Sequence, residues 1–182
     1  DVAYERAAVK RCEKLGIETK LVSLPADVKQ GALMAQIARL NSNERIHGVL
    51  MFRPLPSHLD ERAACAALMP CKDVDGITPE SASMLYTGSG GGFAPCTAEA
   101  VIALLEHYGI GLDGKNAVVV GRSLVIGRPV SMLLLARNAT VTVCHSRTRG
   151  LPELTRRADI VVTALGKAES LTADCFMPGQ IV

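Results

Sequence analysis

Tryptophan is absent from this 182-residue chain, and aromatic residues make up only 3% of it. Few side chains are therefore available to stack on bases, which argues against single-stranded nucleic acid as a ligand. A strong charge of one sign is also lacking, because 20 Lys and Arg against 18 Asp and Glu give a net charge of +2. Nucleic-acid-binding domains usually carry a clear basic excess. We expect a small-molecule ligand and no nucleic-acid partner.

The cysteines form no C-x-x-C pair, so neither a zinc site nor a dithiol redox motif is indicated. We expect reduced, mostly packing residues at all six positions: Cys12, Cys65, Cys71, Cys96, Cys144 and Cys175. A signal sequence and an apolar run of roughly 18 residues are also lacking, which predicts a cytoplasmic protein without membrane association. The chain begins at Asp1 rather than Met and stops in what looks like a strand, so we expect a fragment of a longer polypeptide.

Hydrophobic residues make up 48% of the chain, which is enough for one large or two small cores. Periodicity and turn residues predict helices and strands in alternation, with helices at 2–15, 28–40, 59–68, 98–108, 129–136 and 152–158, and strands at 17–24, 46–52, 117–120, 140–144 and 160–164. This order is typical of the α/β class, with a doubly wound parallel sheet in the second half. A glycine cluster at 88–92 predicts a boundary between domains at 1–97 and 98–182, with Thr97 as a helix cap.

Residues 118–129 combine an apolar strand, a tight turn and a helix start. In a Rossmann unit this is where the backbone approaches a pyrophosphate and the helix N-terminus supplies positive partial charge. The turn departs from G-x-G-x-x-G, because Ser123 and Ile126 stand where the second and third glycines would follow Gly121. Alternatively, the turn merely connects a strand to a helix.

The second predicted strand of this unit ends without a carboxylate. An NAD site usually places Asp or Glu about 20 residues after the first glycine, where it binds the ribose hydroxyls, but residues 121–148 contain no acidic residue. Arg122, Ser146 and Arg147 would instead suit a 2′-phosphate. We therefore expect NADP rather than NAD, although Arg147 and Arg149 could also belong to a solvated loop.

Three further motifs precede this turn: Phe52-Arg-Pro-Leu-Pro56, Lys72-Asp-Val-Asp-Gly76 and Pro95-Cys-Thr97. In this order, the four motifs resemble those of the methylenetetrahydrofolate dehydrogenase/cyclohydrolase family. The resemblance runs along the whole chain, but the family's opening strand and its closing Pro-Gly-Gly-Val-Gly-Pro segment are absent. It implies two α/β domains, the second of the Rossmann type, a tetrahydrofolate substrate, NADP as cofactor and a homodimer.

The resemblance also implies roles for individual residues. Asp75 would bind the pterin, and its carboxylate can accept two parallel hydrogen bonds from a 2-amino group and a ring N–H. Tyr4 would lie against the aminobenzoate ring, and these two residues are the candidate catalytic pair. The remaining folate-cleft residues are Phe52, Pro54, Leu55 and Pro56, and the cofactor residues are Thr97, Gly121, Arg122, Ser123, Gly127, Ser146 and Arg147. Alternatively, Asp73 and Asp75 only shape the turn before Gly76.

At two positions the chain departs from the family pattern in residues that concern the cyclohydrolase activity. Bifunctional members carry Tyr-x-x-x-Lys on the first helix, and that lysine serves the cyclohydrolase step, whereas this chain has Ala8. Phe52 stands where the family usually has a glutamine. Lys10 lies about 240° around the helix from Tyr4. Arg11 returns to the face of Tyr4, but a guanidinium is a poor base.

The resemblance implies oxidation of 5,10-methylenetetrahydrofolate to the methenyl compound by hydride transfer to NADP, and the two departures predict little or no cyclohydrolase activity. One alternative is the ordinary bifunctional enzyme, in which Arg11 or a residue outside this chain supports hydrolysis. Another is a folate- or nucleotide-sensing module without catalysis. A hydrolase triad is not indicated, because no nucleophile or carboxylate lies at a recognisable offset from the histidines His47, His58, His107 and His145.

Overall fold

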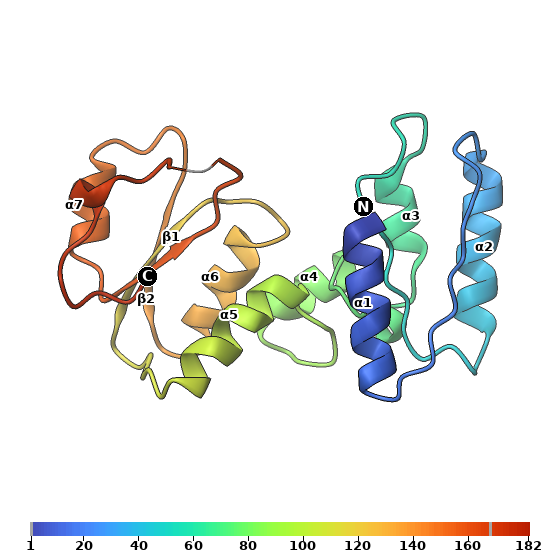
Figure 1. Cartoon of the computed structure of the whole chain (residues 1–182), viewed down its shortest axis with the longest axis horizontal. Helices are drawn as coiled ribbons and strands as arrows, with labels where there is room; N and C mark the ends of the chain where they lie inside the picture. The colour runs from blue at the N-terminus through green and yellow to red at the C-terminus, as the bar shows by residue number, and fades with distance from the viewer. Residues whose placement is uncertain (1, 168) are drawn as a thin grey trace.

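The computed structural model describes residues 2–167 and 169–182. Its first half contains α1 (Val2–Lys14), α2 (Gln30–Ser42) and α3 (Glu61–Ala67), and its second half contains the sheet (Figure 1). Helix α4 (Pro79–Thr87) lies between them and contacts both α3 and α6 (Gly127–Leu135). The structure thus has two parts, with α4 between them.

The second half is a Rossmann-type unit. Its remaining elements are α5 (Cys96–His107), β1 (Asn116–Val120), β2 (Thr140–Cys144), α7 (Leu151–Arg156), β3 (Ile160–Thr163) and a short 3-10 turn at Ala173–Cys175, and a second 3-10 turn, Pro70–Lys72, lies in the first half. The strands are parallel in the order β2-β1-β3, and Val118 pairs with Thr142 on one side and Val161 on the other. The α/β class and the parallel sheet that the sequence predicted are confirmed.

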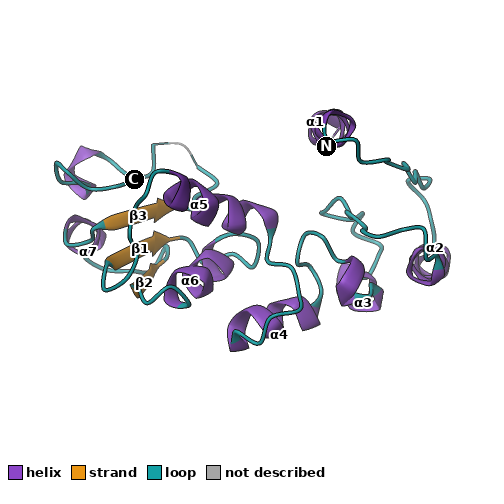
Figure 2. Cartoon of the chain, turned by 90° about the horizontal axis from the view of Figure 1, so that it is seen from below, coloured by secondary structure: helices purple, strands orange, loops and turns teal. Residues whose placement is uncertain are grey.

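Alternate residues of β1 fill two separate cores. Ala117 and Val119 pack with α5 and α6 on one face, whereas Val118 and Val120 pack with residues of α7 on the other. Figure 2 shows the helices on both sides of the strands. Because both faces are covered, the strand is a nearly continuous apolar run, as in other doubly wound sheets.

In the first half, the two predicted strands are wrong. Residues 17–24 form no strand, and within 46–52 only Val49 makes an isolated bridge, to Asp73. Alternating apolar residues become a strand only when a neighbouring segment supplies hydrogen-bond partners. Within the described residues these two segments form no ladder with each other, and Leu21 is 58% exposed. The core of this half is instead helical, with Leu33, Ile37, Ala64 and Leu68 from α2, α3 and the residue after α3.

Two helices also differ from the prediction, α5 in where it starts and α4 in that it forms at all. Thr97 is not a cap, because α5 begins at Cys96 and Pro95 occupies the N-cap position. Helix α4 was not predicted at all, although Thr78 followed by Pro79 is a strong start signal. The Thr78 hydroxyl accepts a hydrogen bond from the Ser81 backbone N–H, as an N-cap should.

All six cysteines are free, and Cys65, Cys144 and Cys175 are buried. Across residues 2–167 and 169–182, no cluster of His, Cys, Asp and Glu could hold a metal ion. Among the helices that the structure describes, none is long and apolar enough to cross a membrane.

Candidate active site

The loop that carries Asp75 meets the start of α5. The Cys96 backbone N–H donates to Asp75 Oδ1 over 3.2 Å, and Cys96 Sγ donates to the Val74 carbonyl over 3.3 Å. Gly76 permits this approach, because its φ is +61° and a Cβ there would lie 2.5 Å from the Phe93 carbonyl oxygen. Two motifs whose contacting residues, Asp75 and Cys96, are 21 residues apart in the sequence therefore form one site.

Tyr4 of α1 belongs to the same group. Partial burial raises the pKa of the Tyr4 hydroxyl, and the negative charge of Asp75 raises it further. The Tyr4 ring lies edge-on to Phe52, with centroids 5.7 Å apart and planes at 88°, which is a favourable aromatic geometry. The hydroxyl is therefore protonated at neutral pH, close to a carboxylate and a thiol.

The two departures from the family both lie next to Tyr4. Ala8 follows Tyr4 by one helical turn, so both share a face of α1, and Phe52 packs against the Tyr4 ring. An apolar methyl and a phenyl ring thus occupy the surroundings of the tyrosine. Lys10 and Arg11 are exposed.

The Phe52–Pro56 segment is anchored on α3 by Glu61. The Leu55 backbone N–H donates to Glu61 Oε2 over 2.8 Å, and Arg53 Nη1 lies 3.7 Å from Glu61 Oε1. Leu55 is half-buried against the core of the first half, whereas Pro54 and Pro56 are exposed. Sequence reasoning missed Glu61, although an acidic residue in the first turn of a helix is a signal for contacts at the helix N-terminus.

The glycine turn closes tightly between β1 and α6. A Cβ at Gly121, whose φ is +132°, would lie 2.4 Å from the Ala164 carbonyl oxygen, and a Cβ at Gly127 would lie 2.2 Å from the Gly121 carbonyl oxygen. Ser123 Oγ accepts hydrogen bonds from the backbone N–H groups of Ile126 and Gly127. The serine therefore shapes the turn, and its own hydroxyl hydrogen can still be donated to a ligand.

We expect Gly127→Ala to lower the free energy of unfolding by about 2 to 3 kcal/mol, because the methyl meets backbone atoms that cannot rotate away. Thermal unfolding should show a Tm about 4 to 12 °C lower. Gly31→Ala in α2, where a Cβ would have open space, is the control and should not lower Tm. An unchanged Tm for Gly127→Ala would contradict the close packing of the turn.

The loop after β2 lies beside this turn. The Gly121 backbone N–H donates to the Cys144 carbonyl over 2.9 Å, which joins the ends of β1 and β2. The His145 backbone N–H donates to Thr148 Oγ1, and the Arg147 backbone N–H donates to His145 Nδ1. These bonds form a compact loop on which Ser146 and Arg147 are exposed.

Helices α5 and α6 connect the two groups of residues. They contact each other and cover the same face of the sheet. Asp75 lies at the N-terminus of α5, where it accepts a hydrogen bond from Cys96, and the glycine turn leads into α6. Among the predicted site residues, the structure therefore brings Tyr4, Phe52 and Asp75 together around the first helix start and gathers Gly121, Ser123 and Gly127 at the second.

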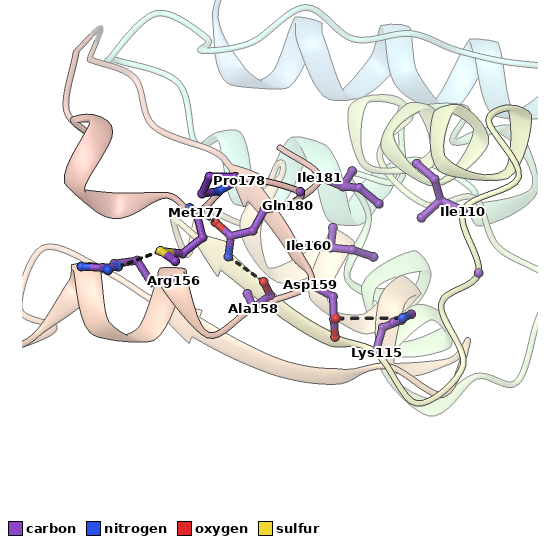
Figure 3. Close-up of a pocket in the computed structure, with 12 residues that line it drawn as sticks. Ile110, Lys115, Arg156, Ala158, Asp159, Ile160, Met177, Pro178, Gln180 and Ile181 are labelled. Atoms are coloured by element: carbon purple, nitrogen blue, oxygen red, sulfur yellow. Dashed lines mark hydrogen bonds and ion pairs between the residues drawn. The ribbon is translucent and has the colours of Figure 1, made fainter.

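A surface cavity of about 500 Å³ lies elsewhere, at the N-terminal ends of β1 and β3. Figure 3 shows the Lys115–Asp159 ion pair in its wall and the Gln180 side-chain amide, which donates to the Ala158 carbonyl. Because Gly121 follows the opposite end of β1, this cavity is separate from both groups of candidate site residues.

A parallel sheet with helices on both faces and a glycine turn after its central strand defines a Rossmann-type nucleotide-binding domain. Here that domain follows a helical half whose Asp75 carboxylate accepts a hydrogen bond from Cys96 at the start of α5. Models of one family match both parts: residues 1–75 match the tetrahydrofolate dehydrogenase/cyclohydrolase catalytic domain, and residues 95–182 match the NAD(P)-binding domain of the same family. The chain belongs to the tetrahydrofolate dehydrogenase/cyclohydrolase family.

Individual relatives agree with this assignment. The bifunctional protein FolD of Clostridium botulinum strain Langeland is 47% identical over all 182 residues, which span 64% of its length. The crystal structure of the Campylobacter jejuni bifunctional enzyme FolD superposes with a TM-score of 0.95 at 38% identity and covers 98% of this chain and 64% of that one. Trypanosoma brucei FolD, solved with NADP cofactor and inhibitor, gives a TM-score of 0.84 at 39% identity over 91% of this chain and 57% of that one.

Proposed function

We propose that this protein oxidises 5,10-methylenetetrahydrofolate to 5,10-methenyltetrahydrofolate, with a folate-binding domain at 1–97 and an NADP-binding domain at 98–182. The observation that carries the proposal is the hydrogen bond from Cys96 to Asp75 at the start of α5, a helix that packs on α6, which the glycine turn begins. Relatives described as bifunctional FolD proteins support the same activity.

The residues present fit NADP. The turn at Gly121 and Gly127 has no room for a Cβ, and α6 begins there, so its N-terminus suits a phosphate. Ser146 and Arg147 are exposed on the adjoining loop, and Arg122 is exposed in the turn. They would hold a 2′-phosphate by charge-assisted hydrogen bonds. When bound, NADP supplies the acceptor for the hydride.

In the folate half, the proposed roles are binding and orientation. Asp75 would accept two hydrogen bonds from the pterin, and the protonated Tyr4 would contact the aminobenzoate ring. The methenyl cation is stabilised by its own two nitrogens, so positioning is the main requirement of the oxidation. No side chain has to remove a proton from the reacting carbon.

Hydrolysis of the methenyl cation has a different requirement, because water must lose a proton and a ring nitrogen must gain one. A positioned acid or base typically contributes about 10² to 10⁴ in rate to such steps. Ala8 and Phe52 offer neither at the positions next to Tyr4. We therefore propose that cyclohydrolase activity is weak. The names of the bifunctional relatives favour the second candidate, an ordinary dehydrogenase and cyclohydrolase.

The test is a turnover assay that compares NADP with NAD and follows the methenyl compound. We expect reduction of NADP, and accumulation of the methenyl compound beyond what spontaneous hydrolysis removes. Prompt formation of 10-formyltetrahydrofolate would favour the second candidate. Failure to reduce either nucleotide, despite binding of both ligands, would overturn the proposal in favour of a sensing module.

The choice of nucleotide gives a separate prediction. Ser146→Ala combined with Arg147→Ala should lower kcat/KM for NADP about 10- to 100-fold, because hydrogen bonds to a charged group contribute about 1.5 to 3 kcal/mol. The kcat/KM for NAD should change little, since NAD lacks the 2′-phosphate. Arg137→Ala just after α6, which removes the ion pair with Glu106, is the control for loss of positive charge. Equal losses for NADP and NAD would contradict the assignment.

A further inference from the structure

Asp73 is a fully buried carboxylate in the loop that carries Asp75. It is 0% exposed. Oδ1 accepts from the Ile77 backbone N–H over 2.9 Å, and Oδ2 accepts from the Thr78 backbone N–H over 2.8 Å and from Ser81 Oγ over 2.7 Å. Both oxygens are therefore satisfied by the first residues of α4 and the segment before it.

The side chain is charged despite its burial. Burial alone would raise the pKa of Asp73, but hydrogen bonds from Ile77, Thr78 and Ser81 outweigh it and hold the pKa below its usual value. Within residues 2–167 and 169–182, Asp73 belongs to no ion pair. A buried charge is costly unless it is hydrogen-bonded, and here three hydrogen bonds offset that cost, so the carboxylate holds the loop firmly to the start of α4.

The neighbouring Lys72 attaches the loop to a different helix, α2. It is 9% exposed, and its Nζ donates to the carbonyls of Leu40, Asn41 and Asn43 at the end of α2. Two consecutive charged residues thus attach the loop to two elements, Lys72 to α2 and Asp73 to α4. The loop is fixed immediately before Asp75, whose carboxylate then meets the Cys96 N–H.

We propose that Asp73 is a positioning residue, which holds the Asp75 carboxylate in the orientation that binds the pterin by fixing the loop to the start of α4. This role rests on the proposed function, since it requires Asp75 to bind the folate. Helix α4 contacts α6 of the nucleotide-binding half, so the same attachment sets Asp75 relative to the proposed NADP site.

The test is Asp73→Asn, which keeps the size of the side chain but presents an NH₂ group to one of three donors. We expect KM for the folate to rise about 10- to 100-fold, in line with loss of a hydrogen bond to a charged group, with a smaller change in kcat and an unchanged Kd for NADP. Ser81→Ala removes one of the three bonds and should give a smaller rise. Hydrogen exchange at the Cys96 amide should accelerate in both variants.

Leu33→Ala is the control for a loss of stability in the same half, because Leu33 belongs to its core and is not one of the residues that bind Asp73. It should lower Tm but leave the folate KM and the Cys96 amide unchanged. A normal folate KM and normal Cys96 exchange in Asp73→Asn would overturn the inference, and Ser81→Ala decides the question if Asp73→Asn does not fold. If the parent chain oxidises no folate, the proposed function fails, whereas Cys96 exchange still reports whether Asp73 holds Asp75.

Discussion

The double variant Ala8→Lys/Phe52→Gln should hydrolyse methenyltetrahydrofolate about 10² to 10⁴ times faster than the parent chain, the range that a positioned acid or base supplies. Lysine at position 8 would lie one turn from Tyr4 on the same face of α1. Glutamine at position 52 would replace the ring that now packs edge-on against Tyr4 and would offer the amine a hydrogen-bond partner. The measurement is the rate of methenyl consumption in the absence of nucleotide.

The single variants separate the two contributions. Ala8→Lys alone should gain less, because its ammonium would face an apolar ring and have no polar partner at position 52. Ala8→Met provides a long side chain without an amine, and we expect no gain from it. If the parent chain already consumes the methenyl compound as fast as the double variant, the proposed loss of cyclohydrolase activity is wrong.

Asp75→Asn should lower kcat/KM for methylenetetrahydrofolate about 10²- to 10³-fold. The amide would present an NH₂ group where the pterin also presents N–H groups, so one hydrogen bond is lost and two donors oppose each other. Removal of one partner of a buried, charged hydrogen-bonded pair costs about 2 to 5 kcal/mol. Steady-state kinetics with varied folate gives the loss.

The fold should survive this substitution, because the remaining Oδ1 of asparagine can still accept from the Cys96 N–H. Tm and the Kd for NADP should therefore stay close to those of the parent chain. Asp113→Asn, at an exposed position, removes the same charge without effect on turnover. If Asp75→Asn turns over folate normally, Asp75 only shapes the turn before Gly76.

Much of the nucleotide-binding half was predictable from local sequence. The three strands of the sheet were predicted within one residue at each end, because β1 and β3 are short apolar runs bounded by turn residues and buried on both faces. The sequence also predicted a tight turn between the strand and the helix, and the structure shows why glycine is needed there, since a Cβ at Gly121 or Gly127 would overlap backbone atoms.

The first half was harder to predict, and the reason is physical. The alternation in 17–24 and 46–52 is a local property, but a strand also needs a hydrogen-bonded neighbour, and within the described residues only Val49 forms a bridge, to Asp73. Helix α4 was missed because its amphipathic pattern is short, although Thr78 and Pro79 mark its start. Local patterns do not specify which distant segment will supply a partner.

The sequence by itself determined the α/β class, the glycine turn, the absence of an acidic residue in 121–148 and the two departures at Ala8 and Phe52. Only the tertiary structure decided that Tyr4 packs on Phe52, that Asp75 binds the start of α5 and that Glu61 and Asp73 anchor the two loops. Residue identity and short-range periodicity are properties of the linear sequence. The contacts, in contrast, join residues that burial and hydrogen bonding bring together only in the folded state.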